Sequence, residues 1–259
     1  MTFYDTHAHL ADPHLASDAA GVIVRAGAVG VTRILAVGTT AASSIDCWRL
    51  AQQFPQVLSS SAGIHPNHAG EAVAGDWGTI EMLSQAPEVV ALGETGLDLY
   101  WKDCPLHLQQ EYFDRHIRLS QQTGLALVIH QRETVNEILE MLRLARRQGE
   151  LHGVMHSFTG NEQEAAEFLD LGLHISFAGM VTFKKSDDLR AVAATIPAQR
   201  LLIETDSPYL TPHPHRGQRP NEPRFIVHTA LFLAEARSLN VAELAALTTA
   251  NAQRLFTRR

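Results

Sequence analysis

The first apolar segment of the chain, residues 3–9 (FYDTHAH), carries an aspartate and two histidines at alternate positions. Alternate side chains of an extended strand point to the same side, so Asp5, His7 and His9 are predicted to share one face. Two imidazoles on one face could hold a metal ion, because histidine is the commonest metal ligand in proteins. A single histidine is more often a hydrogen-bonded core or surface residue, so this hypothesis depends on where the chain places similar side chains.

Similar side chains end five other apolar segments of the chain. They are His65, Glu94, His130, His156 and Asp206. Read singly, each of these residues could belong to a turn that follows a strand. Six segments with the same kind of ending instead predict that the ends meet at one site.

Eight β-rich segments carry or accompany these residues. They cover residues 3–9, 32–38, 56–65, 88–94, 125–130, 153–158, 172–179 and 200–206. Helical patterns lie between them, among them residues 106–124, 133–149 and 160–172, and a last helix is expected over roughly 241–256. This alternation predicts an α/β fold, a single-domain (β/α)8 TIM barrel over residues 1–259. A doubly wound sheet is the alternative, but no Gly-rich phosphate loop follows the first strand.

In a TIM barrel the C-terminal strand ends form the catalytic mouth. The eighth strand would neighbour the first, so Asp206 can join the two histidines of residues 3–9 on one ion. Glu94, His130 and His156 end consecutive strands and can hold a second ion, with Glu94 as the bridge between the two. Imidazole and carboxylate ligands suit Zn²⁺, Mn²⁺ or, less well, Mg²⁺.

The overall composition limits the kinds of protein that this chain can be. Its 28 acidic and 21 basic residues give a net charge of −7, unlike a protein that coats nucleic acid nonspecifically. Two divalent ions would still make a local pocket positive, and such a pocket attracts phosphate. No apolar run approaches the roughly 20 residues of a membrane span, and no secretory signal pattern is present. With two cysteines, Cys47 and Cys104, we expect a cytoplasmic protein with no membrane association and no obligate protein partner.

A series of motifs extends over nearly the whole chain. In order, they are DTHAHL, GIHP, GETGLD, IHQR, HSFTG, LLIETDSPYL, RPNEP and NAQRLF. The series resembles the TatD family of metal-dependent hydrolases, and GETGLD and ETDSPYL are its most specific members. The resemblance implies one metal held by His7, His9, Glu94 and Asp206, a second held by Glu94, His130 and His156, and a substrate phosphate that faces His65. It also implies a Mg²⁺-stimulated deoxyribonuclease, a 3′→5′ exonuclease on single strands or an enzyme that cleaves at abasic sites.

Three positions depart from the usual family motifs. Ala8 stands where cysteine is frequent, Gln131 stands where a smaller residue is usual, and Pro220 is an extra residue in RGQRPNEP. The first two side chains point away from the site on their strands. The extra proline leaves open which arginine of this loop, Arg216 or Arg219, reaches the substrate.

The mechanistic hypothesis is hydrolysis of a DNA phosphodiester with two divalent ions, Mg²⁺, Mn²⁺ or Zn²⁺, that activate a water. Asp206 is the predicted proton acceptor, and Glu94 is the predicted bridge. The residues predicted to bind the substrate phosphate are His65, Arg132, Arg216 and Arg219.

Two other functions fit parts of the pattern. A small-molecule hydrolase of the same fold would act on a lactone, an amide or a phosphotriester. Such relatives often bridge their metals with a carbamylated lysine at the end of strand four, whereas this strand ends in Glu94 and no lysine occurs between residues 1 and 101. A metal-binding protein without activity would need the same ligands but gives no reason for Asp206 at the mouth.

Further polar and aromatic residues lie next to the predicted strand ends. Glu204 and Asp5 lie one layer deeper on the ligand-bearing faces and are predicted to orient ligands. Asp98 could orient a ligand or cap a turn. Tyr100 and Trp101 follow on a loop at the catalytic face and could either anchor that loop or stack against a nucleobase.

Overall fold

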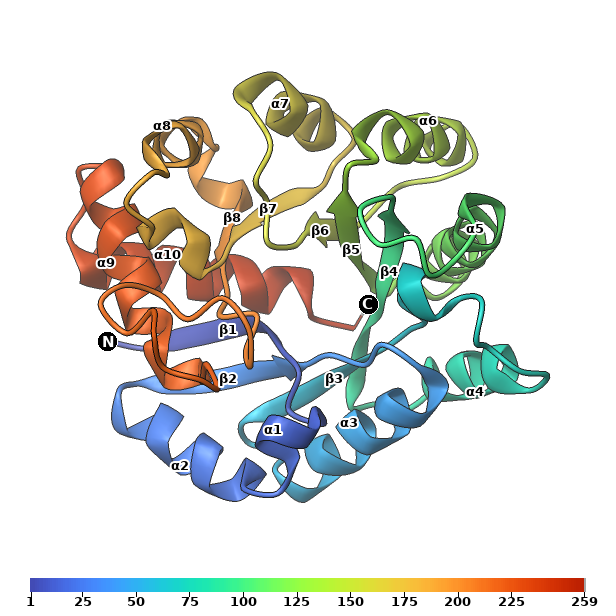
Figure 1. The fold of residues 1–259 in the computed structure, drawn as a ribbon, viewed down its shortest axis with the longest axis horizontal. Coiled ribbons are helices and arrows are strands. Elements are labelled where there is room, and N and C mark those ends of the chain that lie inside the picture. The colour runs from blue at the N-terminus through green and yellow to red at the C-terminus, as the bar shows by residue number, and fades with distance from the viewer. Residues whose placement is uncertain (259) are drawn as a thin grey trace.

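The computed structural model describes residues 1–258 and consists of eight parallel strands surrounded by helices (Figure 1). The strands are β1 (Phe3–Ala8), β2 (Val31–Ala36), β3 (Leu58–Ala62), β4 (Val89–Asp98), β5 (Ala126–Arg132), β6 (Gly153–Met155), β7 (His174–Phe177) and β8 (Leu201–Ile203). Each strand pairs with the next one along the chain, from β1 to β8. This order confirms the predicted barrel.

The last strand meets the first at the catalytic end of the barrel. The Asp206 N–H donates to the carbonyl of His7 (2.9 Å), and the His9 N–H donates to the carbonyl of Ser207 (2.8 Å). Ala8 and Ser207 also form a parallel bridge. Closure of the barrel therefore falls on the residues that were predicted to bind one metal.

Helices form the outer ring (Figure 1). They are α1 (Pro13–Ala16), α2 (Ala19–Ala28), α3 (Ala41–Gln53), α4 (Asp76–Leu83), α5 (Leu106–Thr123), α6 (Val135–Arg146), α7 (Glu162–Asp170), α8 (Asp187–Thr195), α9 (Ile226–Ala236) and α10 (Val241–Leu255), with short 3-10 helices η1 (Pro66–His68), η2 (Gly179–Thr182), η3 (Ala198–Arg200) and η4 (Pro223–Phe225). The four helices predicted from the sequence are α5, α6, α7 and α10. Asn161 and Asn240 begin α7 and α10 with capping boxes, and Gly124 ends α5 at a left-handed φ of 73°.

Alternate residues of the strands enter two apolar clusters, as the period of a strand requires. In β5, Leu127 and Ile129 join the larger cluster, whereas Val128 joins the smaller one together with Phe256 at the end of α10. Figure 1 shows α10 behind β1 and β8. Among the described residues, no helix is long and apolar enough to cross a membrane.

Several strand ends differ from the sequence prediction. β4 continues past Glu94 to Asp98 and β5 continues past His130 to Arg132, because these two strands remain paired through that stretch. β8 stops before Asp206, whose left-handed φ of 53° is incompatible with extended pairing. The ligands therefore lie within strands on one side of the mouth and in loops on the other.

Two glycines let β3 and β4 approach each other beside Glu94. A Cβ atom on Gly63 would lie 2.4 Å from the carbonyl carbon of Gly93, and Gly93 itself has a φ of 133°. A side chain at either position would displace the backbone that carries Glu94.

Candidate metal centre

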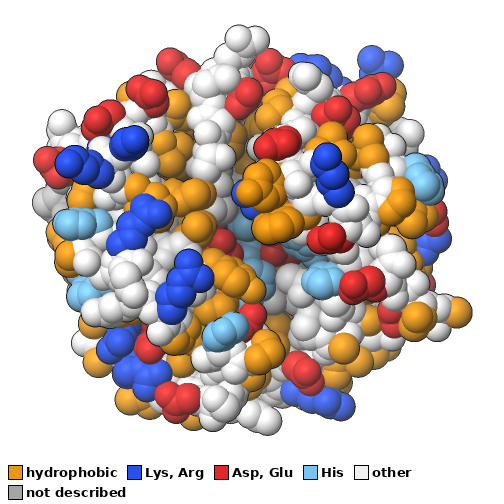
Figure 2. Space-filling model, in the orientation of Figure 1, with side chains coloured by type: hydrophobic (Ala, Val, Ile, Leu, Met, Phe, Trp, Pro, Cys, Tyr) orange, Lys and Arg blue, Asp and Glu red, His pale blue; other side chains and the backbone are white. Residues whose placement is uncertain are grey.

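The predicted metal ligands come together at the mouth of the barrel. They are His7 in β1, His9 directly after it, Glu94 in β4, His130 in β5, His156 after β6 and Asp206 after β8, with His65 after β3 beside them. Except for the fully buried His7, all of them line a cavity of about 830 Å³. Figure 2 shows histidine and carboxylate side chains at the bottom of a hollow on this face of the molecule.

Glu94 stands at the centre of this group and has a different set of neighbours at each oxygen. Its Oε2 lies 3.3 Å from His7 Nε2 and 3.6 Å from His9 Nε2. Its Oε1 lies 2.8 Å from His156 Nε2 and 2.9 Å from His130 Nδ1. A carboxylate with separate histidines at each oxygen can serve two cation positions.

Asp206 belongs to the Oε2 side of the centre. Its Oδ1 lies 3.4 Å from His9 Nε2 and 3.7 Å from His7 Nε2. The ring of His156 stacks on that of His7, with centroids 4.1 Å apart, and so lies between the two sides. The structure thus brings together the predicted ligands, although His156 also clusters with His7 and Asp206 of the other predicted cation position.

Hydrogen bonds show which ring nitrogen of two histidines is free to bind a cation. His9 Nδ1 lies 3.3 Å from the carbonyl of Val37, which can only accept, so this nitrogen carries a proton. His130 Nε2 donates to Asp98 Oδ2 in the same way (3.0 Å). The opposite nitrogens then face Glu94. Because a carboxylate oxygen can only accept, each of these contacts requires a cation between the two atoms, either a proton or a metal ion, so this donor set fits divalent metal ions.

His65 has the opposite arrangement. Its Nδ1 accepts a hydrogen bond from the Asn67 N–H (3.2 Å), so in the neutral ring the proton is on Nε2. That nitrogen lies 3.3 Å from Glu94 Oε1. Burial is the main cause that lowers the pKa of His65, to about 4, and it keeps the ring neutral. His65 is therefore a hydrogen-bond donor at the edge of the centre, although it lies as close to Glu94 as the ligands do.

The charges in the centre depend on one another. Burial alone would raise the pKa of Glu94, but the surrounding imidazoles, His156 first, hold it well below its usual value. Burial likewise favours a neutral His156, but Glu94 and Glu204 raise the pKa of His156 well above its usual value. The buried carboxylate is ionised and requires positive charge beside it, from protons or from metal ions.

The comparisons with known proteins agree with this centre. A family model described as TatD related DNase matches residues 4–257. The chain belongs to the TatD family. It is 37% identical to the metal-dependent hydrolase YabD of Bacillus subtilis over 253 residues, which cover 98% of each chain. It is 36% identical to a protein of Pantoea ananatis named as the 3'-5' ssDNA/RNA exonuclease TatD, again over 98% of each chain. The crystal structure of YjjV, a TatD homologue from Escherichia coli, superposes with a TM-score of 0.91 at 28% identity, over 98% of this chain and 97% of that one.

Three buried carboxylates hold this TatD-family centre in place. Asp98 binds His130, as described above. Glu204 accepts a hydrogen bond from the Ser157 N–H (2.6 Å), and its Oε1 lies 3.4 Å from His156 Nδ1. Asp5 accepts hydrogen bonds from the backbone and the side chain of Thr205 (2.9 and 2.6 Å), so it fixes the loop before Asp206 rather than an imidazole ring.

The arginines predicted to bind substrate lie in different surroundings. Arg132 lines the cavity, and its guanidinium carbon lies 3.5 Å from the centroid of the Tyr100 ring. Arg216 lies over the ring of Phe183 (3.4 Å). Among the described residues, the cavity lining includes neither Arg216 nor Arg219.

Among the cavity-lining residues that sequence reasoning missed are Asp12 and Tyr209. The Tyr209 hydroxyl donates to Asp12 Oδ2 (3.1 Å), and the Tyr209 ring centroid lies 5.9 Å from that of His9. The signal was the tyrosine of ETDSPYL, three residues after Asp206, which had served only to support the family resemblance.

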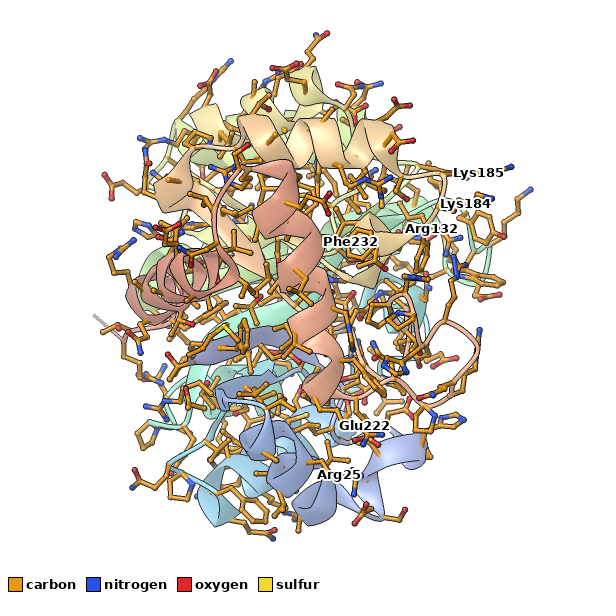
Figure 3. All side chains as sticks on the ribbon, turned by 90° about the vertical axis from the view of Figure 1, so that its left-hand side faces the viewer. Arg25, Arg132, Lys184, Lys185, Glu222 and Phe232 are labelled. Atoms are coloured by element: carbon orange, nitrogen blue, oxygen red, sulfur yellow. The ribbon has the colours of Figure 1, made fainter. Side chains whose placement is uncertain are left out.

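The RPNEP motif fixes the loop that follows Asp206. Asn221 Nδ2 donates to the carbonyl of Thr205 (2.9 Å), and the next residue, Glu222, pairs with Arg25 of α2 (2.8 Å). Figure 3 shows Glu222 and Arg25 next to each other at the foot of this loop. Pro220 precedes these contacts, so the extra residue leaves the anchoring of the loop intact.

Proposed function

We propose that this TatD-family metal-dependent hydrolase cleaves phosphodiester bonds of single-stranded DNA from the 3′ end, with two divalent metal ions at the mouth of the barrel. The observation that carries the proposal is Glu94, whose two oxygens face separate sets of histidines, His7 and His9 at Oε2 and His130, His156 and His65 at Oε1. On this basis His7, His9 and Asp206 would hold one ion, and His130 and His156 would hold the other. The name of the Pantoea relative supports a nucleic acid substrate.

When bound, the ions would supply an activated water and positive charge for the phosphoryl oxygens. Asp206 would accept the proton of that water. Burial opposes ionisation of Asp206, but the hydrogen bond with His9 and the charges of neighbouring imidazoles lower its pKa below the usual value. His65 would donate its Nε2 proton in a hydrogen bond to a phosphoryl oxygen, and Arg132 would contribute positive charge at the rim.

The charge of the cavity supports the need for cations. Four carboxylates line it, those of Asp12, Glu94, Asp98 and Asp206, against the single guanidinium of Arg132. Protons on the histidines of the cavity offset part of this negative charge, and two divalent ions would add four positive charges to it. The cavity would therefore attract an anionic substrate most strongly in its metal-bound form.

The test is a nuclease assay with purified protein. Single-stranded DNA labelled at the 5′ end would be incubated with Mg²⁺, Mn²⁺ or Zn²⁺, with a chelator as the control. We expect a ladder of products that shorten from the 3′ end only when metal is present. An internal abasic site in a second strand, blocked at its 3′ end, separates exonuclease from abasic-site cleavage. Turnover of a lactone or phosphotriester without any cleavage of DNA would contradict the proposal and favour the small-molecule alternative.

A cytoplasmic location stays a prediction.

A further inference from the structure

Arg132 lies at the rim of the cavity beside two aromatic residues that have no role in the proposed hydrolysis. Its guanidinium carbon lies 3.5 Å from the ring centroid of Tyr100 and 5.8 Å from that of Trp101. The two rings meet edge to face, with centroids 5.0 Å apart. We refer to Tyr100, Trp101 and Arg132 as the aromatic rim.

The aromatic rim exposes aromatic surface beside the metal centre. Tyr100 is 48% exposed and Trp101 is 50% exposed, although both are among the largest apolar side chains of the chain. Trp101 and Arg132 line the same cavity as Glu94 and His130. A planar ligand held at the centre would therefore pass over this surface.

One carboxylate ties the aromatic rim to the metal centre. Asp98 Oδ1 accepts hydrogen bonds from the N–H groups of Tyr100 (2.9 Å) and Trp101 (3.0 Å). The other oxygen, Oδ2, accepts from Nε2 of His130 (3.0 Å). The backbone of the aromatic rim and the orientation of a metal-binding imidazole therefore depend on the same side chain.

We propose that the aromatic rim is a stacking site for a nucleobase of the strand whose phosphate lies at the metal centre. This inference rests on the proposed function and assigns it a base-binding position. Every nucleobase has a π face that stacks on indole and phenol rings, so the site would accept all four bases. The guanidinium of Arg132 would add attraction for the phosphate next to the stacked base. Figure 3 shows Lys184 and Lys185 projecting on the same side of the molecule as Arg132, where they can meet the backbone of the same strand.

The experiment compares two strands that differ only in their bases. One is an ordinary single-stranded oligonucleotide, and the other carries abasic tetrahydrofuran residues at its three 3′-terminal positions. Binding is measured by fluorescence anisotropy with a 5′ label and Mn²⁺, on strands whose 3′-terminal linkages are cleavage-resistant phosphorothioates, and cleavage is measured separately on unmodified strands with Mn²⁺. The proteins are the wild type, Trp101→Ala, Trp101→Phe and Arg132→Gln.

We expect the wild type to bind the base-bearing strand about 5- to 150-fold more tightly, the range that one base–aromatic stack supplies. Trp101→Ala should lose most of this preference and leave the affinity for the abasic strand unchanged, whereas Trp101→Phe, which keeps a ring, should retain much of it. Arg132→Gln should weaken the binding of both strands. Arg115→Ala is the matched control, because Arg115 also lies over aromatic rings, Tyr112 and Trp77, but does not line the cavity.

The outcomes separate this inference from the proposed function. If the wild type cleaves DNA but Trp101→Ala keeps the full preference for bases, or weakens both strands alike, the stacking site is wrong and the nuclease stands. If the wild type neither binds nor cleaves either of the two strands, both proposals fail. Circular dichroism shows whether Trp101→Ala is folded; if it is not, Trp101→Leu, which keeps apolar bulk without a ring, replaces it in the same comparison.

Discussion

The histidine His116 and the histidines at the mouth of the barrel have ring nitrogens with different partners. His116, on α5, is fully buried, and both of its ring nitrogens are satisfied by backbone: Nδ1 donates to the carbonyl of Tyr112 (2.6 Å), and Nε2 accepts from the N–H of Ile64 (3.2 Å). At the mouth, in contrast, Nε2 of His9 and Nδ1 of His130 face the carboxylate of Glu94, and these contacts require a cation, a proton or a metal ion, between the two atoms. The comparison teaches that burial alone does not distinguish a predicted metal ligand. The distinguishing feature is a ring nitrogen that faces an anion rather than a backbone group.

Of the substitutions considered, Glu94→Gln should have the largest effect on the chemistry of the mouth. The amide has no negative charge and keeps only one of the two carboxylate oxygens, so the two predicted cation positions lose the carboxylate that they would share. We expect metal-dependent turnover to fall by about a thousandfold or more, since metal activation of water is worth several kcal/mol. Metal content by mass spectrometry and initial rates measure the effect. Glu88→Gln, at the other end of β4, is the matched control, and a Glu94 variant with wild-type rates would refute the bridging assignment.

Metal addition should stabilise the mouth and leave the surroundings of His116 unaffected. At about 100 times its dissociation constant, one bound ion adds about 2.7 kcal/mol to the free energy of unfolding. For a chain of this size we expect the melting temperature to rise by about 5–10 °C with Mn²⁺ and to return with chelator. Calorimetry gives the shift. The rise should be largely absent in Glu94→Gln, and an equal rise in that variant would place the ion elsewhere.

Asp98→Asn should change which ring nitrogen of His130 carries the proton. The amide oxygen can still accept from the loop N–H groups, but its NH₂ group then faces the N–H of His130, so the imidazole must move its proton to the nitrogen that faces Glu94. We expect metal affinity to fall about 10- to 100-fold, as when other supports of this kind are removed. Isothermal titration calorimetry measures the affinity, and Asp103→Asn, an exposed aspartate of the same loop, is the control.

His116 offers the smallest test, through pH. Burial is the main cause that lowers the pKa of His116, to about 4, so the unfolded chain binds a proton below about pH 6.5 while the folded chain does not. Its contribution to stability is therefore present at neutral pH and is lost as the pH falls from about 6.5 towards 4. Between about pH 7.5 and pH 5 this loss amounts to about 2 kcal/mol. In urea unfolding, the free energy of unfolding should fall less between about pH 7.5 and pH 5 for His116→Gln than for the wild type. An equal fall in both proteins would contradict the neutral, buried imidazole.

The sequence predicted the barrel and its order because the alternation of strands and helices leaves few other arrangements. It also predicted which residues meet at the mouth, since strand order alone places Asp206 beside His7. The exact strand ends were not predictable: β4 runs on to Asp98 because pairing with β5 continues, and pairing is a tertiary property.

The protonation of the histidines lay beyond sequence reasoning altogether. His65 and His130 both follow apolar runs, yet one accepts from the backbone of Asn67 and the other donates to Asp98. Those partners are set by the path of the loops. For the same reason the sequence could not place Arg216, whose loop carries it to Phe183 rather than into the cavity.

The closure of the barrel between β1 and the loop after β8 has a consequence for synthesis of the protein. His7 and His9 leave the ribosome well before Asp206, which donates its N–H to the carbonyl of His7 and is predicted to share a cation with the two histidines. Contacts so far apart in the chain form late and slowly. A nascent chain that has not yet released Asp206 therefore lacks the predicted site, and activity should begin only once both segments have emerged and met.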